Sequence, residues 1–260
     1  MTAAIVRSPK LLYSEEEWRI RCDLAALYRL VAHFRMTDLI YTHISARLPG
    51  PEHRFLINQY GVLFHEMRAS DLVKIDLDGN IVDQPNRETR VVNPAGFTIH
   101  SAIHAAREDL RFVVHTHTAA GMAVSAQRDG LLPITQIALK FYGRLAYHAY
   151  EGIALNLDER ERLVRDLGAH SAMILRNHGL LVAGPTVART FNWLYFLEMA
   201  CRAQINALAG GVPLVLPPED VRRTTERQAN PPGDAPQEHE DLAWSAALRL
   251  IANDPTDYRS

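Results

Sequence analysis

The chain of 260 residues lacks several features that mark special classes of protein. It has two cysteines, Cys22 and Cys201, far apart and without metal-like spacing, so neither a disulfide framework nor a cysteine metal site is expected. Its 28 basic and 30 acidic side chains give a formal charge of −2, which excludes the basic excess that nucleic-acid binding requires. No apolar run approaches the ~20 residues that span a bilayer, and the N-terminus lacks the apolar core of a signal peptide. We expect a cytoplasmic protein without nucleic-acid or membrane partners.

Internal repeats and low-complexity tracts are also missing, and 47% of the residues are hydrophobic, which is typical of a globular protein. Ser14 followed by Glu17 is a capping-box signature that predicts the first helix. Periodicity and turn signals predict helices over 15–34, 94–107, 119–127, 157–168 and 186–209, and strands within 40–48, 55–60, 72–83, 111–114 and 171–176. This mixture predicts an α/β sandwich in which helices cover both faces of a largely antiparallel sheet.

The composition changes after Gly211, where six prolines fall between 211 and 240. Because proline breaks both helix interiors and central strands, we expect an extended arm there rather than regular structure. In the last segment, Trp244, Leu248 and Ile251 recur at helical spacing and predict a helix that docks on the body or on a neighbour. The predicted division is a domain over 1–211 and a proline-rich arm with a C-terminal helix over 212–260.

Two histidines end an apolar run in "FVVHTHTAAG", residues 112–121. Strand side chains alternate between faces, so His115 and His117 should point the same way, their Cα atoms about 6.6 Å apart. His178 also ends an apolar run and precedes Gly179, which permits close backbone approach. Structural roles are the commoner use of single histidines, but three imidazoles at strand ends predict a site for zinc or iron.

A longer set of residues carries a family resemblance. The stretches "NPAGFTIHSAIHAAREDLRFVVHTHT" and "ILRNHGLLVAG" resemble the class II aldolase/adducin family, over about residues 15 to 210. The resemblance implies a three-layer α/β/α sandwich with a mixed, largely antiparallel sheet, commonly assembled as a homotetramer. It also implies that His115, His117 and His178 bind a divalent metal, most often zinc, with iron, manganese or cobalt as alternatives.

The departures from the family pattern concern substrate binding. Its sugar-phosphate aldolases place a catalytic glutamate nineteen residues before the first histidine of the pair, where this chain has Gly96. The preceding serines that bind phosphate are replaced by Pro94 and Ala95, and the family's Thr/Gly-Asn turn corresponds to Thr42-His43. The chain thus resembles an adducin-like branch that lacks the glutamate.

Substrate contacts are expected from His43, in place of the family's asparagine, and from Gly96. The loop "NQYGVLFHE" resembles one near the phosphate pocket, so Asn58 and Gly61 are further substrate-binding candidates. Gly61 can equally be a turn residue.

The residue that moves protons must lie elsewhere, since Gly96 has no side chain. The segment "KFYGRLAYHAYEG" gathers Tyr142, Tyr147, His148 and Tyr150, which the family resemblance places near the site. His148 is the preferred acid or base because histidine titrates closest to neutrality, with Tyr142 as a second candidate. The alternative is that the tyrosines only pack.

Three function classes remain open at this point. The first is a metal-dependent carbon–carbon lyase of the aldolase type, acting on a small, non-phosphorylated hydroxy-carbonyl or keto-acid substrate. The second is an iron-dependent oxygenase or decarboxylase of 2-oxo acids at the same three histidines. The third is a non-catalytic, adducin-like interaction module, which the missing glutamate favours and the retained histidines disfavour.

Overall fold

The computed structural model describes residues 9–82, 91–153, 157–231 and 238–260. Its helices are η1 (Pro9–Leu12), α1 (Glu15–His33), η2 (Ala69–Asp71), α2 (Pro94–Ala106), α3 (Ala119–Ser125), α4 (Gln136–Leu139), α5 (Glu159–Leu167), α6 (Val187–Ala209), α7 (Glu219–Ala229) and α8 (Glu238–Leu248). Its strands are β1 (His43–Arg47), β2 (Phe55–Ile57), β3 (Val73–Ile75), β4 (Phe112–Thr116), β5 (Leu145–His148), β6 (Ala172–Leu175) and β7 (Gly179–Gly184). Among the described residues, no helix combines the length and apolar character needed to cross a membrane.

The seven strands form one sheet in the order β3-β2-β1-β4-β7-β6-β5. Every neighbouring pair is antiparallel except β5 and β6, which are parallel, so the sheet is mixed and largely antiparallel as predicted. The capping prediction at the first helix is confirmed, because the Ser14 hydroxyl accepts a hydrogen bond from the Glu17 amide at 3.2 Å. β4 is the central strand of the sheet, between β1 and β7. The end of β4 that carries the histidines is therefore flanked by strands on both sides.

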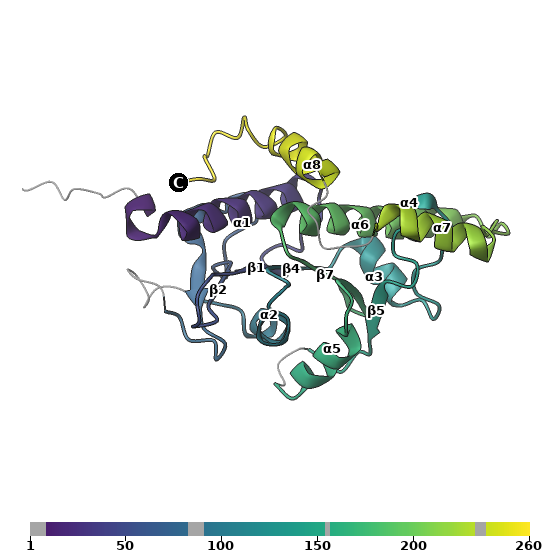
Figure 1. The fold of residues 1–260 in the computed structure, drawn as a ribbon, viewed down its shortest axis with the longest axis horizontal. Coiled ribbons are helices and arrows are strands. Elements are labelled where there is room, and N and C mark those ends of the chain that lie inside the picture. Colours follow the sequence, from purple (N-terminus) through teal and green to yellow (C-terminus); the bar gives the residue numbers. More distant parts are fainter. Residues whose placement is uncertain (1–8, 83–90, 154–156, 232–237) are drawn as a thin grey trace, which may run out of the picture.

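Helices cover both faces of the sheet (Figure 1), as the alternation of hydrophobic residues requires. On one face, α1 and α6 pack over the larger core, to which β4 contributes Phe112 and Val114. On the other face, α2 and α5 enclose a second core that contains Val113. Because strand side chains alternate, His115 is on the same face as Val113, beneath α2.

The expectation of an extended arm after Gly211 is wrong over residues 219–229, which form the regular helix α7. The prolines flank this helix instead of interrupting it: Pro218 is its N-cap, and Pro231 follows its C-cap Asn230. α8 packs on α6, where the Trp244 and Phe191 rings lie 5.6 Å apart, so the predicted C-terminal helix docks on the body of the same chain.

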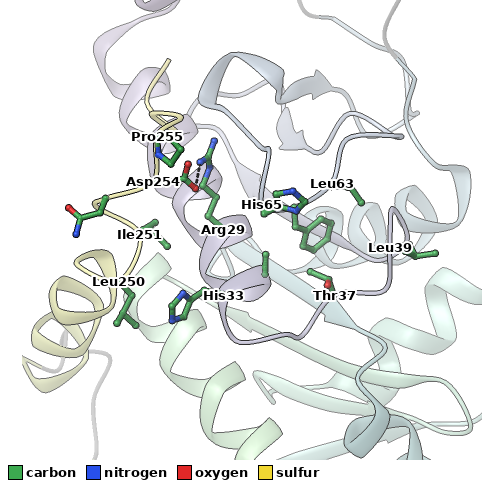
Figure 2. Close-up of a pocket in the computed structure, with 13 residues that line it drawn as sticks. Arg29, His33, Thr37, Leu39, Leu63, His65, Leu250, Ile251, Asp254 and Pro255 are labelled. Atoms are coloured by element: carbon green, nitrogen blue, oxygen red, sulfur yellow. Dashed lines mark ion pairs between the residues drawn. The ribbon is translucent and has the colours of Figure 1, made fainter.

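The chain end also returns to α1, at a hollow of about 640 Å³ (Figure 2). Arg29 forms an ion pair with Asp254 at 2.8 Å and donates to the Met67 carbonyl at 2.8 Å, which ties the C-terminal segment to α1. Although His33 and His65 line this hollow, they belong to no converging set of ligand atoms among the described residues. It is therefore not the candidate site.

Candidate metal centre

His115 and His117 converge as their spacing predicts. His115 is in β4, and His117 follows the last residue of that strand. Their Nε2 atoms are 2.8 Å apart. His115 is buried within the sheet, whereas His117 lies just beyond the end of β4 and is partly exposed.

His178 joins them from the tight turn between β6 and β7. Asn177 adopts the left-handed conformation there, with φ of +55°, which asparagine tolerates better than most residues. A Cβ atom at Gly179 would lie 2.3 Å from the Thr116 carbonyl oxygen, so only glycine lets this turn approach β4 so closely. As a result, the Nε2 atom of His178 is 3.2 Å from that of His115.

The outer nitrogens of the pair in β4 are held by acceptors. The Nδ1 atom of His115 is 3.0 Å from the Leu180 carbonyl oxygen, and the Nδ1 atom of His117 is 2.9 Å from the Asp38 carboxylate. Because both partners accept hydrogen bonds, each Nδ1 carries the proton and each Nε2 presents a lone pair inward. Two lone pairs that face each other at this distance are favourable around a cation.

The geometry of the three nitrogens fits a divalent ion. Zinc–nitrogen bonds of about 2.0–2.1 Å in a tetrahedral site imply nitrogens about 3.3 Å apart, close to the 2.8 and 3.2 Å found here. In the part of the chain that the structure describes, these three side chains are the one such cluster, with ligand atoms all within 4.8 Å of one another. The residues present therefore fit a zinc-type ion.

Burial keeps the imidazoles of His115 and His178 neutral. It lowers the pKa of His178 to about 4, with a further contribution from the neighbouring His117. Burial also holds the pKa of His115 well below its ordinary value. Neutral imidazole is the form that binds metals, so His115 and His178 are ready to coordinate at neutral pH.

A cavity of about 510 Å³ opens onto the three histidines. Its walls combine apolar and polar side chains, and the aromatic ones are Tyr41, Tyr60 and Tyr150. The Tyr150 ring centroid is 6.3 Å from that of His178. A cavity of this size accommodates a small organic molecule beside the ion.

His43 is in the cavity wall, as the sequence predicts, and is paired directly opposite His115 across β1 and β4. It is buried, and burial lowers its pKa to about 3. Gly96, predicted to bind substrate, is in the first turn of α2 directly over the His43 ring and does not line the cavity.

The other two predicted substrate-binding residues lie outside the cavity lining. Asn58 is buried, and its side-chain oxygen accepts a hydrogen bond from the Tyr28 hydroxyl at 2.9 Å. Gly61 has φ of +97° and open space around the position of a Cβ atom, which suits the turn role that was its alternative.

The structure does not bring the two predicted acid–base residues to the cavity of the same chain. The Nδ1 atom of His148 is 2.8 Å from the Asp166 carboxylate, and its Nε2 atom is 3.4 Å from Glu159. The Tyr142 hydroxyl donates to Glu219 of α7 at 2.5 Å. Neither residue is among those that line the cavity.

Sequence reasoning missed Asp38 and the roles of Tyr41 and Tyr60 in the cavity wall. These residues belong to no motif, because they come from loops that only the fold brings to the histidines. Thr42 was identified in the sequence only as part of the turn Thr42-His43, which corresponds to the family's Thr/Gly-Asn turn. It has φ of +68°, which is strained for a β-branched residue, and its buried hydroxyl has no hydrogen-bond partner among the described residues.

His100 and His104, four residues apart on α2, do not form a second metal site. Both contact the Ser45 hydroxyl, with distances of 2.6 Å to His100 Nδ1 and 2.7 Å to His104 Nε2. All three side chains are buried between α2 and the sheet. Their role there is structural.

Comparisons with known proteins agree with this fold. Residues 22–205 match the family model described as Class II Aldolase and Adducin N-terminal domain. A solved aldolase II superfamily protein from Pseudomonas syringae is 54% identical, with a TM-score of 0.89 over 95% of this chain and 98% of that one. An L-fuculose 1-phosphate aldolase from Glaciozyma antarctica PI12 is 27% identical, with a TM-score of 0.77 over 94% of this chain and 91% of that one.

The chain is similar to adducins as well. Alpha-adducin of Rattus norvegicus is 42% identical over 232 residues, which are 87% of this chain and 31% of that protein. The family model spans most of the chain, and these relatives include both aldolases and adducins. With its seven-stranded mixed sheet and three converging histidines, the chain belongs to the class II aldolase and adducin family.

Proposed function

We propose that this protein is a metal-dependent carbon–carbon lyase of the aldolase type. The observation that carries the proposal is the convergence of three Nε2 atoms, from His115, His117 and His178, on one point of a 510 Å³ cavity. A lyase of this type needs an electrophile that withdraws electrons from the bond being broken. When bound, a divalent ion supplies that Lewis acidity, and three neutral imidazoles leave its double positive charge intact. Zinc is the ion we expect, and iron, manganese and cobalt also accept nitrogen ligands.

The substrate in this proposal is a small, non-phosphorylated hydroxy-carbonyl or keto acid. No lysine or arginine is among the described residues that line the cavity. A phosphate group would therefore lack the charge-assisted hydrogen bonds that normally hold it, each worth about 1.5–3 kcal/mol. Pro94 and Ala95 likewise offer no hydroxyl groups.

Within one chain, the cavity wall favours Tyr150 as the group that exchanges a proton with the substrate. It lines the cavity, is 53% exposed and is next to His178, so a bound molecule can reach its hydroxyl. His148 and Tyr142 stay predictions from sequence. His148 is in β5 and contacts Asp166 of α5 through one ring nitrogen. This contact suits a residue that holds β5 against α5.

We also propose a homotetramer. Large apolar side chains that line the cavity are exposed, with Ile153 at 73%, Tyr150 at 53% and Tyr41 at 46%, and a neighbouring subunit would cover them. Light scattering at micromolar concentration tests this directly. A monomer at that concentration would contradict the proposal.

A metal analysis of untagged protein, combined with a screen of small keto acids and hydroxy-carbonyls, tests the function. Stoichiometric zinc with carbon–carbon cleavage is the expected result. Iron with dioxygen consumption would identify the oxygenase instead. The similarity to alpha-adducin favours the interaction module as the second candidate, and protein that binds no divalent metal at all would support it. Turnover of a phosphorylated ketose at ordinary rates, about 1–10³ per second, would contradict the assigned substrate class.

A further inference from the structure

His43 presents ring nitrogens that nothing in the described protein uses. Its side chain is 95% buried, since only 5% of its surface is exposed, and neither Nδ1 nor Nε2 has a hydrogen-bond partner among the described residues. Burying a polar group without a partner costs about 1–3 kcal/mol. A buried residue in that condition at the wall of a ligand cavity points to a partner that arrives with the ligand.

The polar residues behind His43 contact one another through Ser45, although the Nε2 atom of His100 has no hydrogen-bond partner among the described residues. The His100 ring is 6.0 Å from the His43 ring, centroid to centroid, and its Nδ1 atom contacts Ser45. The nitrogens of His43 therefore bond to none of these residues, and the residue forms part of the cavity wall. The adjoining Thr42 hydroxyl, also buried and unpartnered, extends the same wall.

Gly96 is what allows the His43 ring to occupy this place. A Cβ atom built at Gly96 would lie 2.3–2.4 Å from the Cδ2, Cγ and Nδ1 atoms of His43, whereas real Cβ contacts essentially never fall below 3.0 Å. The space over the ring is therefore filled by the backbone of α2. One side chain fits between α2 and β1 at this point, and it is the imidazole.

We propose that His43 is a catalytic residue that donates a hydrogen bond to a carboxylate or carbonyl oxygen of the bound substrate, and that Gly96 is its positioning residue. This inference rests on the proposed function, because it assigns a role within the same cavity. Positions 43 and 96 form a steric pair in which any side chain at 96 displaces the imidazole. A neutral imidazole N–H beside the Thr42 hydroxyl suits an oxygen acceptor of the substrate.

A double-mutant cycle tests the steric pair, using the zinc-loaded full chain and thermal unfolding. Gly96→Ala should lower the melting temperature, and His43→Ala in the same chain should restore it, because the clash is then removed. Gly210→Ala is the matched control, since no atom lies within 4 Å of a Cβ there, and it should leave melting unchanged. If the two substitutions changed the melting temperature additively, the proposed steric contact between positions 43 and 96 would be wrong.

Calorimetric titration with pyruvate and with oxalate tests the donor. His43→Ala should weaken binding about 10-fold or more while zinc content stays stoichiometric, because one hydrogen bond to a charged acceptor is lost. Gly96→Ala should weaken it similarly, and the double variant should bind no worse than His43→Ala alone. His43→Asn, which keeps an N–H donor, should recover part of the loss.

Three outcomes would overturn the donor role. One is loss of zinc in His43→Ala, which would make His43 a ligand. The second is unchanged probe binding in His43→Ala, and the third is no binding of either probe by the zinc-loaded wild type. These measurements involve no turnover, so absence of lyase activity would refute the proposed function while leaving this inference standing.

Discussion

Asp38→Ala should weaken metal binding without removing any of the three proposed ligands. The Asp38 carboxylate lies 2.9 Å from the Nδ1 atom of His117 and fixes both the tautomer and the orientation of that ring. Loss of such an orienting carboxylate typically reduces metal affinity 10- to 100-fold, or about 1.4–2.7 kcal/mol. Because the Asp38 side chain is 42% exposed, solvent weakens the interaction, and we expect a loss near the 10-fold end.

Competition with a calibrated zinc chelator measures this affinity, and circular dichroism confirms that the variant is folded. Asp38→Asn keeps a hydrogen-bond acceptor and should lose less affinity than Asp38→Ala. Asp129→Ala removes an exposed carboxylate whose partner is the neighbouring Arg128, and it serves as the control. Equal zinc affinity in wild type and Asp38→Ala would refute the idea that this contact orients His117 for the ion.

Three further perturbations probe the site and the polar residues beneath α2. His117→Ala should strip most of the bound metal and leave the fold largely intact, so stoichiometric metal by mass spectrometry in that variant would contradict the ligand assignment. Ser45→Ala leaves buried nitrogens of His100 and His104 without their shared partner and should cost about 1–3 kcal/mol, lowering the melting temperature by several degrees. Ser101→Ala, which loses only a contact within α2, should melt close to wild type. Burial lowers the pKa of His104 in the folded chain to about 3, compared with about 6.5 in the unfolded chain. Between these two pH values, the unfolded chain binds a proton at His104 and the folded chain does not. The stabilisation is therefore complete above pH 6.5 and falls as pH drops toward 3, by about 2 kcal/mol at pH 5. Denaturant titrations of metal-free His104→Gln should show a shallower pH dependence than wild type, and an identical slope would contradict the assignment.

Local sequence signals determined the elements that carry the histidines. The capping residues around Ser14, the short apolar run of "RFVV" and the glycine after His178 each act over a few residues, so they can be interpreted without the fold. The same signals placed His115 and His117 on one face and allowed the close approach of Gly179 to β4, which the structure contains. Proline spacing was misleading at α7, because prolines that flank a helix and prolines that prevent one produce the same composition.

Tertiary structure decided how the cavity around the three histidines is assembled. Asp38, Tyr60 and Tyr150 are far apart in sequence, and strand order brings their loops to one cavity. It also directed Tyr142 toward α7 and left His148 outside the cavity lining, although both are near Tyr150 in sequence. The contact between Gly96 and His43 joins residues more than fifty positions apart, and it depends on how closely α2 approaches β1. Helix–sheet separation is set by all the side chains packed between the two layers, so no local pattern in the sequence could have predicted it.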